Sequence, residues 1–298
     1  MGSPEAARDY SEPEYAKSQD RTKVPYYHAN IDNRLVPETQ ELLEKYSHVP
    51  REKQLEHVHL IRDKAWDIRA YPCIGLGSWL TPQLCRLPVY DDILKRVKEG
   101  AILMDVGTFL GHDLRRLVYD GAPSDKLYGV DIVNHFDVGY EFFRDRDRFK
   151  GHFIQTDILS TTSPDLMALK GKADIILVSQ VLHQWDWENQ VRAAQAMVAF
   201  TKPGSWIVGN QIGNPVAQDF QLKSFSAAVW RHNPDSFAKM FEAVGAATGS
   251  HWETQAWLRS FPEMGWDAKD GAWMEPNVSV IEFVARRMSY MLVHIDTN

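Results

Sequence analysis

Short apolar runs alternate with amphipathic stretches through most of this chain. A run of mainly apolar residues predicts a strand buried on both faces, whereas apolar residues three and four positions apart predict a helix. The expected strands are 101–106, 126–132, 152–157, 173–181, 205–212, 251–258 and 279–287. The expected helices are 38–45, 54–70, 90–97, 112–119, a helix that begins after the N-cap Asp186, and 235–244. This order predicts an α/β fold with a doubly wound, seven-stranded, mostly parallel sheet whose terminal strand pair is antiparallel.

The N-terminal third lies outside this alternation. Residues 1–37 begin with a polar and charged stretch, which predicts a flexible tail. Within 54–70, an apolar stripe recurs at helical spacing in Val58, Ile61, Ala65 and Ile68. A helix with such a stripe needs a surface to cover. We therefore expect 38–100 to form a helical cap over a core domain that spans 101–298.

The stretch from Met104 to Asp113 passes from an apolar run through a glycine turn into a helix. Gly107 and Gly111 permit backbone conformations that other residues resist. A dinucleotide turn reads G-x-G-x-x-G, and its second glycine lets a pyrophosphate approach the backbone, but that position is Phe109 here. The turn therefore favours a ligand with an adenosine and no phosphates, and S-adenosylmethionine is the commonest such ligand.

An aspartate closes each of three successive expected strands: Asp105, Asp131 and Asp157. Asp131 lies 24 residues beyond Gly107, near the offset at which an acid receives ribose hydroxyls. Because the carboxyl ends of parallel strands meet at one edge of a sheet, we expect these acids to converge around one nucleoside. The expected cofactor-binding residues are Asp105, Gly107, Thr108, Gly111, Asp131, Ile132, Asp157, Ile158 and Ser179.

Composition narrows the class of partner. The chain has 298 residues, is 44% hydrophobic and 24% charged, and carries a formal net charge of -7. No stretch gathers five or six Lys or Arg, so we expect no nucleic-acid partner. Neither a secretory signal nor an apolar run long enough to span a membrane is present. The two cysteines, Cys73 and Cys85, suggest no disulfide framework and no metal site, and they favour a cytoplasmic protein.

The acceptor side of the site is less clearly marked. His183 follows the expected strand 173–181 and is the candidate general base, and packing under the adenosyl group is the alternative role. Arg69 lies beside Tyr71 and offers a guanidinium clamp for a carboxylate. The segment 209–232, inserted after the fifth expected strand, is the expected lid over an apolar ligand. The expected substrate-binding residues are Arg69, Tyr71, Trp185, Gln211 and Trp230.

These motifs occur together in one known family. The D-x-G-x-x-x-G turn, Asp131, Asp157, ADIILVSQVLHQWDW and KPGSWIVGNQIG resemble class I S-adenosylmethionine-dependent methyltransferases. More narrowly, YPCIG, HDLRRLVYDGAPSDKLYGVDI and FAKMFEAVGAATGSHW resemble the fungal meroterpenoid methyltransferases of the austinol and terretonin type, over roughly 38–287. The family's turn usually reads D-L-G-C-C-x-G-Q, whereas Thr108, Phe109 and His112 stand here at the two cysteine positions and the glutamine position.

The resemblance implies methylation of the carboxyl group of a small hydrophobic aromatic or terpenoid acid in secondary-metabolite biosynthesis. A phenol is the less favoured acceptor. A homodimer is also implied by the resemblance alone. Two alternatives remain open: an enzyme on the same scaffold that guides a cyclisation or rearrangement without methyl transfer, and a binding or regulatory protein with a decayed pocket.

Overall fold

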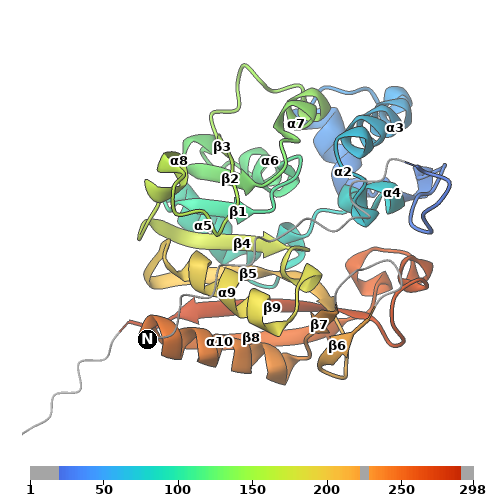
Figure 1. Ribbon diagram of the computed structural model, residues 1–298. Helices are drawn as coiled ribbons and strands as arrows, with labels where there is room; N and C mark the ends of the chain where they lie inside the picture. The colour runs from blue at the N-terminus through green and yellow to red at the C-terminus, as the bar shows by residue number, and fades with distance from the viewer. Residues whose placement is uncertain (1–19, 222–227, 290–298) are drawn as a thin grey trace, which may run out of the picture.

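A seven-stranded sheet forms the centre of the protein (Figure 1), for which a computed structural model describes residues 20–221 and 228–289. The strands lie in the order β3-β2-β1-β4-β5-β9-β8. Pairs from β3 to β5 are parallel, and β9 is antiparallel to both β5 and β8. The bounds are β1 Leu103–Val106, β2 Leu127–Asp131, β3 His152–Gln155, β4 Ala173–Ser179, β5 Thr201–Gly213, β8 Trp252–Arg259 and β9 Ser279–Arg287. The expected fold class is confirmed.

Strand β5 begins earlier than the expected 205–212. Thr201 pairs with Ala173 of β4, and Trp206 is the next residue to pair, with Ile175. The register shift accommodates Lys202-Pro203-Gly204, because proline cannot donate to a ladder and is tolerated at irregularities of this kind. The proline and glycine therefore lie within the bounds of the strand and do not separate it from the preceding helix.

Helices cover both faces of the sheet, which explains the apolar runs. In β4, Ile176 and Val178 pack with α9 and α10, whereas Ile175 and Leu177 pack with α5 and α6 on the other face. Alternate residues of a strand point to opposite faces, so a strand covered on both sides is apolar throughout. The helix bounds are α5 Tyr90–Lys98, α6 His112–Tyr119, α7 Phe136–Phe143, α8 Pro164–Met167, α9 Trp187–Val198 and α10 Pro234–Thr248. Asp186 is the N-cap of α9, as expected, and accepts from the Asn189 amide at 2.9 Å.

The N-terminal helices form a third apolar cluster, at the carboxyl edge of the sheet. The cluster is built from the π-helical turn η2 Leu42–Tyr46, α3 Arg51–Ile68, α4 Pro72–Leu76 and the 3-10 turn η3 Ser78–Leu80. Helix α2 Pro37–Glu41 precedes η2, and the 3-10 turn η4 Leu84–Arg86 packs with α5 through Leu84. The core of the cluster includes Phe142 and Phe143 of α7. Helix α5 packs instead against the sheet through Ile93 and Val97. Of the expected cap 38–100, the helices up to Leu80 therefore form a separate cap, whereas α5 belongs to the layers of the sheet.

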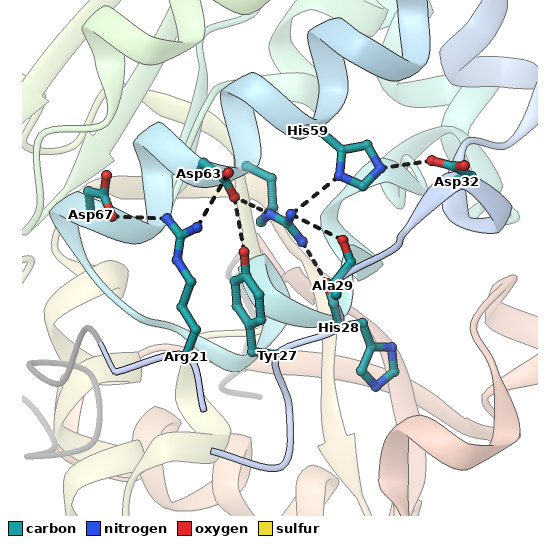
Figure 2. A network of polar contacts seen from close by, with 9 residues as sticks. Arg21, Tyr27, His28, Ala29, Asp32, His59, Asp63 and Asp67 are labelled. Atoms are coloured by element: carbon teal, nitrogen blue, oxygen red, sulfur yellow. Dashed lines mark hydrogen bonds and ion pairs between the residues drawn. The ribbon is translucent and has the colours of Figure 1, made fainter. Parts of the chain in front are cut away.

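The expectation of a flexible tail over 1–37 is wrong for the described residues 20–37. Tyr26 and Ile31 are buried in the same core as α3. Figure 2 shows the polar network around Tyr27, His28 and Asp63 that holds this segment against α3. The Arg62 guanidinium of α3 donates to the carbonyl oxygen of His28 at 2.7 Å and to Asp63 at 2.5 Å. Tyr27 also donates to Asp63 at 3.1 Å. Polar composition predicted disorder here, but a few apolar and aromatic side chains dock the segment. Residues 1–19 lie outside the described part of the chain.

The segment 209–232 contains two short strands that were not expected. After β5 the chain forms β6 Gln218–Phe220 and β7 Val229–Arg231, which pair antiparallel in a separate two-stranded sheet. Residues 222–227 of the expected lid lie outside the described residues. The other long connection at this end, 260–278 between β8 and β9, is called the β8–β9 loop below. It holds η7 Pro262–Met264 and η8 Ala268–Gly271.

Candidate functional site

A cavity of about 280 Å³ opens at the carboxyl ends of the parallel strands. It lies where the N-terminal helices and the β8–β9 loop face the same side of the sheet (Figure 1). We call it the carboxyl-edge cavity. The predicted site residues that line it are Tyr71, Asp105, Gly107, Thr108, Asp131, Ile132, Asp157, Ile158, Ser179, His183 and Trp185. Apart from Tyr71, these residues come from the ends of four parallel strands, β1 to β4, which meet at one edge of the sheet.

The glycine turn has the backbone that the sequence demanded. Gly107 has φ 76°, and its amide donates to the Val130 carbonyl oxygen at 2.8 Å. A side chain at Gly107 would also meet Val181, since a Cβ there would lie 2.3 Å from Cγ2. Gly111 has φ 73° and precedes α6, but it does not line the cavity. Its contribution is to turn the chain into the helix.

Asp131 joins the ends of two strands. One carboxylate oxygen accepts from the Phe109 amide at 2.9 Å and the other from the Val133 amide at 3.0 Å. Asp157 similarly accepts from the Leu159 amide at 2.8 Å. An ionised carboxylate has about four acceptor positions. Both acids can therefore accept from a ligand while they hold their own loops.

Two more carboxyl groups line the cavity, those of Asp105 and Asp113. Burial, together with the nearby Asp113, raises the pKa of Asp105 well above its ordinary value, and Asp105 accepts from the Thr108 hydroxyl at 2.7 Å. Burial raises the pKa of Asp113 to about 6, and Asp113 accepts from the Leu84 amide at 3.0 Å. Asp105 and Asp113 therefore sit in a poorly solvated environment that disfavours the ionised form.

His183 lies in the 3-10 turn η6, Leu182–Gln184, directly after β4. Burial, together with the Arg231 guanidinium, lowers the pKa of His183 far below its ordinary value. Its Nδ1 is buried and has no hydrogen-bond partner among the described residues. The imidazole is therefore neutral at physiological pH and only a weak base.

Three predicted substrate residues do not line the cavity. The Arg69 guanidinium donates to the Ile68 carbonyl oxygen at 2.9 Å. Gln211 donates to Gln190 of α9 at 3.1 Å, and its neighbour Ile212 lines the cavity instead. Successive side chains of β5 alternate between faces, so one position decides which residue reaches the ligand side. The Trp230 amide donates to the Trp185 carbonyl oxygen at 2.9 Å, which places β7 behind the cavity wall.

The β8–β9 loop supplies a wall that the sequence reading missed. Its lining residues are Phe261, Trp266, Asp270, Trp273 and Met274. No site residue was expected in this glycine- and tryptophan-rich stretch. Its three aromatic residues in a connection between two strands were the available signal.

An aromatic group lines the side of the cavity near the glycine turn. Phe109 lies 4.9 Å from His135 and 6.0 Å from Trp79 between ring centroids, and Trp79 lies 5.2 Å from His112. Burial lowers the pKa of His112 to about 3 and that of His135 to about 4. These histidines are therefore neutral and pack as aromatic rings.

The charges of the lining have one sign. Its acidic residues are Asp105, Asp113, Asp131, Asp157 and Asp270. No Lys or Arg of the described residues is among the lining residues. Phosphate groups are usually bound by guanidinium, ammonium or helix N-termini. The lining therefore suits a ligand without phosphates, and an acidic group that enters it meets no cationic side chain.

Known proteins with similar sequences are fungal methyltransferases. A family model described as the meroterpenoid methyltransferase N-terminal domain matches residues 26–80. The O-methyltransferase atr3 of Stereocaulon alpinum is 38% identical over 240 residues, which cover 79% of this chain and 69% of the relative. The asnovolin E/chermesin D methyltransferase nvfJ of Aspergillus novofumigatus is 37% identical over 222 residues, covering 74% of this chain and 80% of the relative.

A solved structure supports the fold. The 1,6-didemethyltoxoflavin-N1-methyltransferase of Burkholderia thailandensis matches with a TM-score of 0.50 at 12% identity, covering 81% of this chain and 91% of that chain. That structure holds 1,6-didemethyltoxoflavin and S-adenosylhomocysteine. In the described part of the chain, no helix is long and apolar enough to cross a membrane.

Proposed function

Because the chain belongs to the fungal meroterpenoid methyltransferase family and is an S-adenosylmethionine-dependent methyltransferase, we propose that it methylates the carboxyl group of a small hydrophobic acid. The acid is aromatic or terpenoid, and the reaction belongs to secondary-metabolite biosynthesis. The observation that carries the choice of a carboxyl group is the weakly basic His183, because a carboxylate acceptor needs no base whereas a phenol does.

The residues of the carboxyl-edge cavity fit the cofactor. Ile132 follows Asp131 and is 41% exposed, so an apolar side chain remains open beside the acid that would receive ribose hydroxyls. Ser179 has a buried hydroxyl without a hydrogen-bond partner among the described residues. We assign the nucleoside to Asp131, Ile132, Asp157 and Ile158, and the remainder of the cofactor to Asp105, Gly107, Thr108 and Ser179. When bound, the cofactor supplies an electrophilic methyl group on a sulfonium.

The acceptor then occupies the other end of the cavity. The lining there comes from the turn that carries His183 and Trp185, from Ile212, and from the β8–β9 loop. Tyr71 lies on the side of the N-terminal helices. These mostly apolar walls match a hydrophobic skeleton, and they exclude water from the reacting atoms.

The protonation state of the acceptor, and the loss of charge on methyl transfer, favour a carboxylate over a phenol. A carboxylate, with a reference pKa near 4, is ionised at neutral pH, whereas a phenol near 10 needs a base. His183 is a poor base in this environment. Methyl transfer from a sulfonium to a carboxylate cancels both charges, so a wall of low polarity assists it. A guanidinium clamp would instead stabilise the ionised acceptor before reaction.

A labelling experiment tests this function. The protein is incubated with methyl-labelled cofactor and a prenylated hydroxybenzoic acid, which offers a carboxyl and a phenol on one skeleton. We expect label in a product that loses labelled methanol on treatment with base, as a methyl ester does. The methyl ester of the same acid, which retains only the phenol, is the control acceptor and should remain unlabelled.

Two results would contradict the proposal. Label that survives base would show methylation at an atom outside the carboxyl group, such as the phenol oxygen. A converted product without label would favour a cyclisation or rearrangement on the methyltransferase scaffold.

We also propose, on the family resemblance, that the protein is a homodimer, and that it works in the cytoplasm. Sedimentation equilibrium tests the first, and a monomeric mass would refute it. Both cysteines are free, in keeping with a reducing compartment.

A further inference from the structure

Arg231 of β7 is among the largest fully buried side chains, with 2% of its surface exposed. Its Nε donates to Glu275 at 2.6 Å and its Nη2 to the other oxygen of Glu275 at 3.4 Å. Its Nη1 donates to the carbonyl oxygen of His183 at 2.7 Å. One planar guanidinium thus contacts two segments that are far apart in the sequence.

Both segments contribute walls to the acceptor end of the cavity. His183 belongs to η6, and Trp185 follows it, whereas Glu275 follows Met274 in the β8–β9 loop. Arg231 and Glu275 do not line the cavity themselves. The η6 wall is held to β7 at a second point, since the Trp185 carbonyl oxygen accepts from the Trp230 amide at 2.9 Å.

Two residues predicted as substrate contacts belong to the same scaffold. Gln190 donates to the carbonyl oxygens of Trp185 and Trp230, at 3.0 and 2.9 Å, and Gln211 donates to Gln190 at 3.1 Å. Gln211 and Trp230 therefore support the wall from behind. Arg231 is the member of this group whose side chain extends the support to the β8–β9 loop.

Stability alone does not explain a buried ion pair in this place. Removing two charges from water costs about as much as their attraction returns, and apolar residues of similar volume often stabilise a fold equally well. A guanidinium fork can satisfy a carboxylate and a carbonyl group simultaneously in fixed geometry, which a lysine ammonium does less well. The arrangement is suited to holding two walls at a fixed separation.

We propose that Arg231 is a positioning residue that sets the distance between the η6 turn and the β8–β9 loop, and thereby determines how well the cavity binds its hydrophobic acceptor. The inference rests on the proposed function in one respect, the assignment of this end of the cavity to the acceptor. Cofactor binding, at the opposite end, does not depend on Arg231.

The test variant removes both charges of the pair. Arg231→Met with Glu275→Leu leaves no unpaired buried charge, so the fold should survive, but the His183 carbonyl oxygen loses its donor. We expect amide hydrogen exchange to accelerate at least tenfold in peptides covering 182–186 and 270–276, and to stay unchanged in 105–113. The KM for the prenylated hydroxybenzoic acid should rise at least tenfold, whereas the dissociation constant of S-adenosylhomocysteine, measured by calorimetry, should change less than threefold.

Two further variants sharpen the comparison. Arg231→Lys keeps a positive charge beside Glu275. Its KM for the acceptor should therefore lie between those of the wild type and the double variant. Arg286→Met removes an arginine from β9, where it donates to Gln255 and lies over the Trp206 ring, away from both walls, and should leave the acceptor KM unchanged.

Unchanged exchange in the two walls, or an unchanged acceptor KM in the double variant, would overturn the inference. An equal loss of S-adenosylhomocysteine affinity would overturn it as well, because the effect would then not be confined to the acceptor end. Failure of the proposed function is read separately, from a base-stable label in the wild-type product, whereas the exchange measurement needs no turnover.

Discussion

At the scale of residues, the site is organised by a few side chains that bond to backbone. Asp131 accepts from the Phe109 amide and so ties the end of β2 to the turn after β1. Phe109 has φ 51°, a conformation that is strained for a bulky side chain and needs such support. The acid predicted to receive ribose hydroxyls therefore also shapes the glycine turn. The G-x-x-x-G spacing and the strand-ending acid were both visible in the sequence because both are local.

The kinetic role of His183 distinguishes a carboxylate acceptor from a phenol acceptor. If the acceptor is a carboxylate, His183→Gln should change kcat by less than threefold, since no proton has to be removed. A general base would contribute about 10²-fold or more. Steady-state kinetics at saturating cofactor measures the difference, with the exposed His251→Gln as the control. A hundredfold loss confined to His183→Gln would favour a phenol.

His112 makes stability depend on pH. Burial holds its pKa at about 3 in the folded protein, below the ordinary value of 6.5. A lowered folded pKa contributes stability that is present above pH 6.5 and is lost as pH falls toward 3, because the unfolded chain binds the proton first. His112→Phe removes this contribution while it retains a ring. The difference in unfolding free energy between variant and wild type should shift in favour of the variant by about 2 kcal/mol from pH 8 to pH 5.

Urea denaturation at the two pH values measures this shift. If the unfolding free energies of the variant and the wild type changed equally with pH, the pKa of His112 would not be lowered by burial as proposed.

At the scale of elements, two long connections are candidates for the segment that covers the ligand: residues 209–232 and the β8–β9 loop. The sequence favoured 209–232, but of its described residues only Ile212 lines the cavity, whereas the β8–β9 loop contributes Phe261, Trp266, Asp270, Trp273 and Met274. Strand β7 lies behind the η6 turn and contacts its backbone. Periodicity predicts where a strand or helix lies, but a loop has no period, and its position is decided by the partners it finds.

Hydrogen exchange distinguishes the two connections. With S-adenosylhomocysteine and the prenylated acid bound together, we expect amides in 261–274 to gain protection, because their side chains contact the ligand. Amides in 214–221 and 228–232 should change little. The converse pattern, with protection confined to the β6–β7 hairpin, would restore the original lid assignment.

At the scale of the whole molecule, the N-terminal segment and the β8–β9 loop hold each other. Arg34 donates to the two carboxylate oxygens of Asp270 at 2.9 and 2.6 Å, and both side chains are buried. Tyr26 packs against Trp273, with 5.2 Å between ring centroids. These contacts join residues more than 230 positions apart. The segment that composition marked as a tail is therefore an anchor for one wall of the cavity.

Arg34→Met should destabilise the protein by about 3 kcal/mol or more, because it leaves Asp270 buried without its partner. The double variant with Asp270→Leu should regain most of that loss, since no charge is then left unpaired. Urea denaturation of the three proteins measures both changes. Equal destabilisation by the single and double variants would show that packing, and not charge, accounts for the contact.

The sequence by itself determined the order of strands and helices, the seven-stranded α/β sheet, the glycine turn and the acids at strand ends. Each follows from a local pattern, either a hydrophobic period or a residue type that its backbone position requires. Only the tertiary structure decided that Ile212 and not Gln211 faces the cavity, that the β8–β9 loop lines it, and that residues 20–37 are anchored. Those outcomes depend on contacts between distant segments, and such contacts leave no period in the chain.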